Sequence, residues 1–301
     1  MRRGPAAARP PAVSSLPRSE FRGCAVRIAI AQTDARLGDV QSNLNEARQR
    51  IAEAAEDGAD LVVFPELSLH GYALGSVAED TSVAVGDPRL AALSEAGPDV
   101  LVGIYERAGL RHHNTAVYLS GGRAVHVQRK LYLPNYLMWE ERKHFYPGQR
   151  LNAFDTAHGR MASLICNDAW QPMLPWLAAQ DGAEVLLVTA NSAAVSDEST
   201  VDNFSYWREL LRYTARMQQC WVVFVNRVGD EDGASFWGGS HVVDPGGAVV
   251  AEAPLWEPAL VVADVDVHAA RQRRRTVPLL QDPRFDLLAR EIGRLHSAET
   301  G

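Results

Sequence analysis

Apolar and polar positions along the chain alternate in the way expected when strands and helices take turns. Residues 26–32 form an apolar run of strand length. The segment 42–56 repeats apolar residues at helical spacing, and we expect Ser42 to cap this helix and Gly58 to end it. Residues 61–64 then read as a second buried strand. A strand, a helix and a strand in this order predict parallel pairing with a right-handed crossover.

The same reasoning predicts two further helices and enough strands for mixed sheets. Glycine-rich turns at 120–122 and 244–247 predict hairpins, so antiparallel pairs should lie beside the parallel ones. The further strands are expected at 100–105, 114–119, 124–128, 161–165, 185–189, 221–226, 240–243 and 260–266, and the further helices at 175–180 and 203–219.

A weak internal repeat divides the chain into two similar halves. The sequence of 57–64, Asp-Gly-Ala-Asp-Leu-Val-Val-Phe, returns at 181–188 as Asp-Gly-Ala-Glu-Val-Leu-Leu-Val. The first copy leads to Glu66 and the second to Asn191. Two similar halves predict two similar sheets packed face to face, with helices outside and a site where strand ends from both halves meet.

Length and composition favour one α/β domain. A chain of 301 residues with 47% hydrophobic residues can bury a large core, and no shift in composition divides it. Residues 1–25 are rich in Pro, Ala, Ser and Arg and lack the apolar core of a signal peptide, so we expect a flexible leader. The domain is expected at 26–270 and a tail at 271–301. In that tail, 285–292 predicts a short amphipathic helix, either at an oligomer interface or on the surface.

Charge and cysteine usage narrow the possible partners. The net charge of -7 argues against a nucleic-acid partner, and the one basic run, 271–275, is expected to be a solvated segment. No apolar stretch approaches the roughly 18 residues that cross a bilayer, so no membrane span is predicted. Cys24, Cys166 and Cys220 are odd in number and lack disulfide spacing, which fits a reducing cytoplasm.

Three separate segments carry residue types that together could cleave an amide. Cys166 ends an apolar strand, and a free thiol with a pKa of about 8.5 needs a base or a lowered pKa to attack a carbonyl. Glu66 is the candidate base. Lys130 and the backbone N–H of Asn167 are candidate donors to an oxyanion. Taken singly, each side chain has a structural explanation: a core thiol, a helix-start carboxylate or an exposed lysine.

Together these segments resemble the signature motifs of the nitrilase superfamily, the carbon-nitrogen hydrolases. Phe-Pro-Glu-Leu lies at 64–67, Arg-Lys-Leu-Tyr-Leu-Pro at 129–134 and Leu-Ile-Cys-Asn-Asp-Ala-Trp at 164–170. Their order and separations are similar to those of the family, and the similarity extends over roughly 26–266. The resemblance implies a four-layer αββα sandwich of two mixed sheets with pseudo-two-fold internal similarity. It also implies a homodimer or a higher homo-oligomer.

The resemblance also implies a set of site residues. Glu66, Lys130 and Cys166 match the family's catalytic triad. A second family glutamate matches Glu141, or Glu140 if the register slips by one. The candidate oxyanion or substrate-binding residues are Asn167, Asn191 and Tyr72. No metal and no organic cofactor is implied.

Cys-Asn-Asp at 166–168 is similar to the Cys-Glu-Asp of glutamine-amide-hydrolysing domains and favours an amide over a nitrile. We therefore expect a small carboxamide or an N-carbamoyl compound to be hydrolysed to an acid and ammonia or an amine, through a thioester on Cys166. The alternatives are nitrile hydrolysis, acyl transfer or ammonia supply to a partner synthetase with the same triad, and a scaffold without activity. The acyl group is left open.

Overall fold

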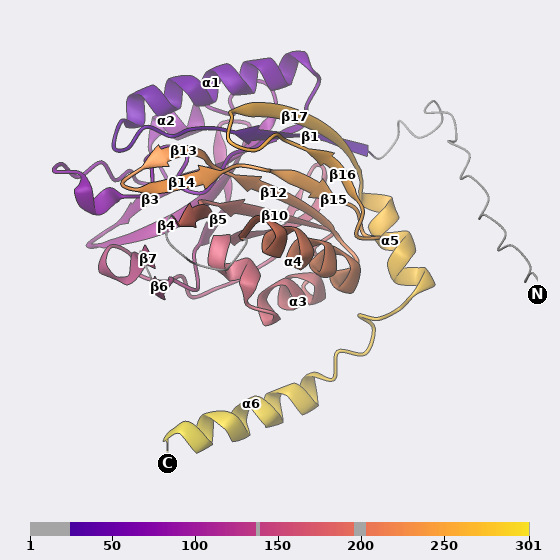
Figure 1. The fold of residues 1–301 in the computed structure, drawn as a ribbon. Helices are drawn as coiled ribbons and strands as arrows, with labels where there is room; N and C mark the ends of the chain where they lie inside the picture. The colour runs from indigo at the N-terminus through magenta and orange to yellow at the C-terminus, as the bar shows by residue number, and fades with distance from the viewer. Residues whose placement is uncertain (1–24, 137–138, 196–202, 301) are drawn as a thin grey trace, which may run out of the picture.

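Two six-stranded sheets lie face to face between helices in the computed structural model, which describes residues 25–136, 139–195 and 203–300 (Figure 1). The first sheet has the order β17-β1-β2-β3-β4-β5, and the second has the order β16-β15-β12-β10-β9-β8. The strands of the first sheet are β1 (Ala25–Gln32), β2 (Leu61–Val63), β3 (Asp99–Ala108), β4 (Arg111–Ser120), β5 (Arg123–Arg129) and β17 (Ala259–Asp266). Those of the second are β8 (Phe154–Thr156), β9 (Gly159–Ile165), β10 (Val185–Ala190), β12 (Trp221–Asn226), β15 (His241–Val243) and β16 (Val249–Glu252).

The two sheets repeat one pairing pattern, which confirms the two similar halves. In the first, β17 is antiparallel to β1, β1 to β3 run parallel, and β4 and β5 are antiparallel. In the second, β8 is antiparallel to β9, then β9, β10 and β12 run parallel, and β15 and β16 are antiparallel. The hairpins predicted at 120–122 and 244–247 join β4 to β5 and β15 to β16. Thus β1 corresponds to β9, and β2 to β10.

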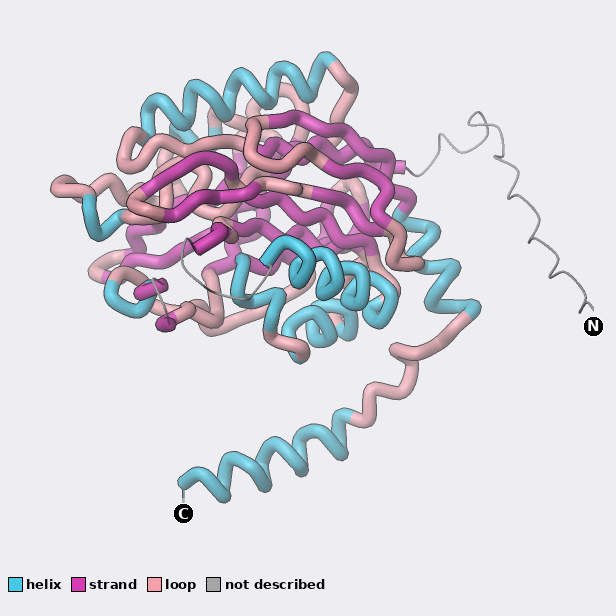
Figure 2. The backbone as a smooth tube through the Cα atoms, in the orientation of Figure 1, coloured by secondary structure: helices cyan, strands magenta, loops and turns pink. Residues whose placement is uncertain are grey.

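Three apolar layers hold the sandwich together, as the αββα prediction requires. α1 (Val40–Glu56) covers the outer face of the first sheet, and α3 (Met173–Gln180) and α4 (Asn203–Gln218) cover that of the second (Figure 2). Between the sheets, Ile30 and Val63 pack with Ile165 and Leu187. Alternate side chains of each strand face opposite layers, so nearly continuous apolar strands are required.

The first helix begins earlier than predicted. α1 starts at Val40, and its cap is Asp39, whose carboxylate accepts a hydrogen bond from the Ser42 N–H at 3.0 Å. Ser42 therefore lies inside the helix, and the prediction that it is the cap was wrong. An aspartate three positions earlier satisfies the same orphan N–H groups. Gly58 has φ +71° and follows the last turn, as predicted.

The C-terminal region adds contacts and length to what the sequence predicts. The basic run 271–275 lies in α5 (Val267–Thr276), where Arg271 pairs with Glu184 and Arg274 donates to the Ala183 carbonyl. The run is largely exposed, as expected of a solvated segment, and these two guanidinium groups in addition hold α5 against the second sheet. The predicted short helix at 285–292 is α6 (Phe285–Thr300), which extends away from the body of the molecule (Figure 1).

Smaller elements complete the described chain. In one lesser sheet β14 pairs with both β11 and β13, and in the other β6 pairs with β7. No helix in the described ranges is both long enough and apolar enough to pass through a bilayer. The leader up to residue 24, with Cys24, lies outside the described residues. The remaining elements are η1 (Leu74–Ser76), α2 (Pro88–Ala91), β6 (Asn135–Tyr136), β7 (Trp139–Glu140), η2 (Glu141–Lys143), η3 (Cys166–Trp170), β11 (Ala193–Val195), β13 (Val228–Glu231) and β14 (Ala234–Trp237).

Candidate active site

The ends of four strands bring the predicted site residues together. Glu66 follows β2 and Lys130 follows β5, both in the first sheet. Cys166 directly follows β9 and Asn191 directly follows β10, both in the second sheet. A hydrogen bond of 2.7 Å from the Asn191 backbone N–H to Glu66 Oε2 joins the two halves. The carboxyl ends of parallel strands in both sheets therefore build one site.

A buried ammonium group lies between two carboxylates. Lys130 Nζ donates to Glu66 Oε1 at 2.7 Å and to Glu141 Oε1 at 2.6 Å, and the side chains of the two charged partners and of Lys130 are at most 2% exposed. Asn114 Nδ2 donates to the same Glu66 oxygen at 2.7 Å. Burying an unpaired charge costs several kcal/mol. The ammonium and the two carboxylates therefore depend on one another, and these contacts fix the positions of the three side chains.

The electrostatics of this cluster favour a permanently charged lysine. Burial alone would lower the pKa of Lys130, but the carboxylates of Glu141 and Glu66 outweigh it and raise that pKa well above the usual value. Burial raises the pKa of Glu141 to about 7, although Lys130 acts in the opposite direction. The site thus combines a fixed cation with a carboxyl group that titrates near neutrality.

Of the two candidate second glutamates, only Glu141 reaches the cluster. Glu140 is exposed and forms an ion pair with Lys143 at 2.6 Å. Tyr72 donates its hydroxyl hydrogen bond to Glu141 Oε1 at 2.8 Å. Burial and the Glu141 charge raise the pKa of Tyr72, so it remains a donor. The structure therefore places Tyr72 on the second glutamate.

Cys166 turns the chain sharply out of β9. Its φ of +48° lies in the left-handed region, which few residues other than glycine adopt, and the residue is half-buried. Burial and the Glu66 carboxylate raise the pKa of the Cys166 thiol well above its usual value, while Lys130 acts to lower it. The resting sulfur is consequently a thiol, and its reaction with a carbonyl requires a base.

Two polar residues of the site carry roles that the sequence did not predict. Asn114 opens the predicted strand 114–119, and its amide fixes one oxygen of Glu66. A polar amide at the start of an otherwise apolar strand was the only signal for it. Asp168 stands inside the third motif and is completely buried. The predicted Asn167 donates its side-chain amide to the Tyr132 carbonyl at 3.1 Å.

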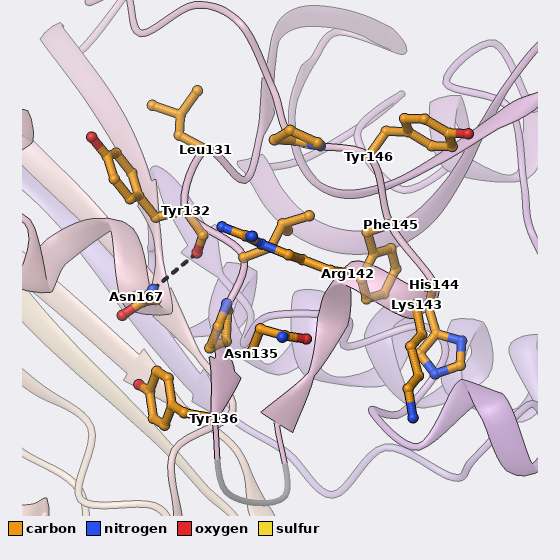
Figure 3. A pocket seen from close by; sticks show the side chains of 13 residues that line it. Leu131, Tyr132, Asn135, Tyr136, Arg142, Lys143, His144, Phe145, Tyr146 and Asn167 are labelled. Atoms are coloured by element: carbon orange, nitrogen blue, oxygen red, sulfur yellow. Dashed lines mark hydrogen bonds between the residues drawn. The ribbon is translucent and has the colours of Figure 1, made fainter. Parts of the chain in front are cut away.

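Two cavities lie beside the segments that carry the cluster, and only the smaller is lined by one of its charged side chains. The larger, about 880 Å³, is formed by residues 131–136 and 142–147 together with Asn167 (Figure 3). Its lining includes Arg142, Lys143 and His144 and no carboxylate. The smaller, about 390 Å³, is lined by Tyr72, Glu141 and Phe236, among others. Across the described ranges, no group of three or more His, Cys, Asp or Glu side chains is arranged to hold a metal ion.

Comparison with known proteins places the sequence of this chain in one family. The sequence model described as carbon-nitrogen hydrolase matches residues 27–275. An (R)-stereoselective amidase of a Pseudomonas species is 33% identical over 269 residues, which are 87% of this chain and 93% of the relative. The N-carbamoylputrescine amidase of Arabidopsis thaliana is 26% identical over 83% of this chain and 89% of its own length.

Longer proteins match as well. The glutamine-dependent NAD(+) synthetase of Thermotoga maritima is 30% identical over 256 residues, which are 80% of this chain but 42% of the synthetase. The chain therefore spans less than half the length of that relative. Among solved structures, an amidase of the nitrilase superfamily from Nesterenkonia sp. AN1 superposes with a TM-score of 0.76 at 27% identity, covering 89% of this chain and 98% of its own. Since the family model matches well over half of its residues, the chain belongs to the carbon-nitrogen hydrolase family.

Proposed function

We propose that the protein is an amidase that hydrolyses a linear, non-peptide C–N bond through a thioester on Cys166. The observation that carries the proposal is the buried ammonium of Lys130, held between Glu66 and Glu141 where the ends of both sheets meet. This arrangement supplies a base and a cation beside a thiol. Relatives of nearly the same length are an (R)-stereoselective amidase and N-carbamoylputrescine amidases.

The first half of the reaction forms the acyl-enzyme. As Cys166 Sγ attacks the amide carbonyl, Glu66 takes the thiol proton, because the raised pKa of the thiol leaves it protonated at rest. The carbonyl oxygen becomes an oxyanion, to which Lys130 Nζ and the Asn167 backbone N–H donate. The C–N bond then breaks, Glu66 returns the proton to the nitrogen, and ammonia or an amine leaves.

The second half restores the thiol. Glu66 takes a proton from water, whose oxygen attacks the thioester carbon, and the same two donors hold the oxyanion again. The C–S bond breaks, the proton returns to sulfur, and the acid is released. Glu141 keeps Lys130 in place throughout, since its Oε1 accepts from both Lys130 and Tyr72.

The proposed substrate is a small carboxamide or an N-carbamoyl compound. Solved structures of the Nesterenkonia amidase carry covalent additions from acrylamide and from fluoroacetamide on the active-site cysteine, which supports both a thiol nucleophile and amide-sized ligands in a related fold. The test is a panel of aliphatic amides, N-carbamoyl amines, glutamine and nitriles, with ammonia release and intact mass as readouts. We expect amide turnover and a transient acyl adduct on Cys166. Turnover of nitriles alone, or full activity in Cys166→Ala, would contradict the proposal.

Ammonia supply to a partner synthetase is the second candidate, and one observation favours it. Several relatives are glutamine-dependent NAD(+) synthetases, of which this chain matches less than half. In this case glutamine would be the preferred amide of the panel, and its turnover would rise when a synthetase is added. Hydroxylamine in the same assay separates acyl transfer from hydrolysis, because transfer diverts the acyl group to a hydroxamate.

We also propose a homo-oligomer in the cytoplasm. Apolar side chains remain exposed on α3, α4 and α6, and Phe285 of α6 contacts Trp176 of α3 with ring centroids 5.7 Å apart. Cys166 and Cys220 are free thiols, which suits a reducing compartment. Light scattering of the native protein and of Ile292→Asp tests the first point: a dimer that becomes a monomer supports it, and an unchanged mass contradicts it.

A further inference from the structure

Asp168 is a buried carboxylate for which the proposed reaction has no step. It is 0% exposed and lies two residues after Cys166, in η3. Its Oδ1 accepts hydrogen bonds from the backbone N–H groups of Leu131 at 3.0 Å and Tyr132 at 2.8 Å. Its Oδ2 accepts from the backbone N–H of Ile165 at 3.2 Å. One carboxylate therefore binds the residues that follow Lys130 and the residue that precedes the thiol.

A second contact joins the same two segments. Asn167 donates its side-chain amide to the Tyr132 carbonyl at 3.1 Å, so both polar groups of the Tyr132 backbone are held from η3 (Figure 3). Lys130 itself is fixed on its other side, because its backbone N–H donates to the Asn114 carbonyl at 2.8 Å. The main chain around the lysine has little freedom to move relative to η3.

We propose that Asp168, assisted by Asn167, is a positioning residue that sets the placement of the Lys130 ammonium relative to the Cys166 thiol. Lys130 belongs to the first sheet and Cys166 to the second, so their separation depends on contacts between segments that are 37 residues apart in sequence. A carboxylate that accepts several N–H bonds gives stronger and better directed contacts than neutral groups do. Such a contact also stabilises the left-handed turn at Cys166, which L-residues adopt only when their surroundings enforce it.

The positioning role of Asp168 rests on the proposed function only where it predicts a change in kcat. A displacement of about 1 Å in the reacting groups can lower the rate of reaction by about 100-fold. Asp168→Asn replaces one accepting oxygen with an N–H donor, which must then face a backbone N–H. We expect kcat to fall about 100-fold, with KM changed by less than about threefold and a circular dichroism spectrum like that of the native protein.

Alkylation of the thiol tests the placement without any substrate. Lys130 acts to lower the pKa of the Cys166 thiol and so stabilises the thiolate. A displaced ammonium should therefore raise the pH midpoint of iodoacetamide alkylation at Cys166 by about one unit. The mass of the peptide that contains Cys166 measures the extent of alkylation. Loss of folding stability alone would not move this midpoint. An unchanged midpoint and unchanged kcat in folded Asp168→Asn would overturn the proposal.

A matched control lies beside the same lysine. Glu106 is also buried, and it accepts hydrogen bonds from the side chain of Arg129, the residue before Lys130, at 2.8 and 2.7 Å. Glu106→Gln should lower the melting temperature but leave the alkylation midpoint unchanged. An equal shift in both variants would show a general effect of removing buried charge and would overturn the specific role of Asp168.

Two further outcomes separate this inference from the proposed function. A native protein that hydrolyses no amide, combined with a shifted midpoint in Asp168→Asn, would reject the amidase proposal and support the positioning role. If Asp168→Asn does not fold, Asn167→Ala takes its place, because it removes only the donor to the Tyr132 carbonyl. A smaller rise in the alkylation midpoint then supports the proposal, and a native midpoint overturns it.

Discussion

The two halves of the sandwich share one strand pattern but use the ends of corresponding strands differently. β1 ends at Gln32, whereas the corresponding strand β9 leads into Cys166. Gln32 is completely buried, and both the oxygen and the nitrogen of its side-chain amide form hydrogen bonds within the fold. Its Oε1 accepts from the Ser240 N–H and hydroxyl, and its Nε2 donates to the carbonyls of Pro254 and Glu257. Cys166 instead presents its reactive atom from a left-handed turn.

The ends of β2 and β10 differ in the same manner. Glu66, after β2, places a carboxylate in the site, and this carboxylate accepts hydrogen bonds from Lys130, Asn114 and Asn191. Asn191, after β10, contributes its backbone N–H, while both polar atoms of its buried side chain lack a protein partner within the described residues. A repeated fold thus supplies equivalent positions, and the side chain decides whether a position holds the structure or belongs to the candidate site.

The largest expected effect contrasts two thiols of the second half. Cys166→Ala should lower kcat by about 10⁴-fold or more, because no acyl-enzyme forms. Cys220 is completely buried, unlike the half-buried Cys166, and it lies away from the cluster, before β12. Cys220→Ala should keep activity within about twofold and cost about 1 kcal/mol of unfolding free energy. Ammonia release and urea unfolding measure the two effects, and comparable losses of activity would break the contrast.

The next effect tests the structural role of Gln32. Gln32→Ala removes four hydrogen bonds and leaves the N–H of the buried Ser240 without its acceptor, and the carbonyls of Pro254 and Glu257 without this donor. We expect a loss of about 4 kcal/mol in the free energy of unfolding. At temperatures where the variant is folded, thiol alkylation should proceed at the native rate. A native free energy of unfolding in urea would show that this strand end does not hold the halves together.

The loop after Glu66 should depend on pH through His70. Burial lowers the pKa of His70 to about 4, and the neutral ring contacts the Thr81 carbonyl and accepts from the Tyr105 N–H. Since its folded pKa lies below the unfolded value of 6.5, its contribution is complete above pH 6.5 and is lost as pH falls toward 4. The loss amounts to about 3 kcal/mol.

Urea unfolding between pH 7.5 and 4.5 measures this dependence. The difference in free energy between the native protein and His70→Gln should shrink as pH falls, since glutamine does not titrate. A difference that stays constant over this range would contradict the assignment of His70 as a buried neutral imidazole.

The smallest effect concerns the amide that has no protein partner. Asn191→Ala retains the backbone N–H to Glu66, so we expect a change of less than about 1 kcal/mol in stability. If its side chain binds substrate, kcat/KM should fall about 10-fold. Native kcat/KM across the amide panel would remove Asn191 from the substrate contacts and leave it with its backbone role.

The sequence was sufficient for features that depend on local pattern, and insufficient for those that depend on distant contacts. Glu66, Lys130 and Cys166 were singled out because the segments around them, each beside an apolar strand, together resemble the family's motifs. Asn114 was missed because its role appears only when the folded first sheet brings its amide to Glu66, 48 positions earlier in the chain.

One error and one incomplete prediction have the same physical origin. Ser42 was preferred as a helix cap because serine is a good cap, but Asp39 fits the same position with a charged acceptor. Arg271 was expected in water and is exposed, but the sequence did not show that Glu184 lies close enough to pair with it. In each case the local structure depends on a residue in contact with the predicted one, and that contact is not visible in the local sequence pattern.

The bond between Glu66 and Asn191 joins residues that are 125 positions apart, and the bond between Glu66 and Lys130 spans 64 positions. Contacts of such long sequence separation form late in folding, because the entropy of closing large loops must first be offset. A nascent or fragmented chain would therefore carry the cysteine without its partners. Catalytic turnover should return only with the last phase of refolding, after helical signals have recovered, so activity itself reports when the two halves have docked.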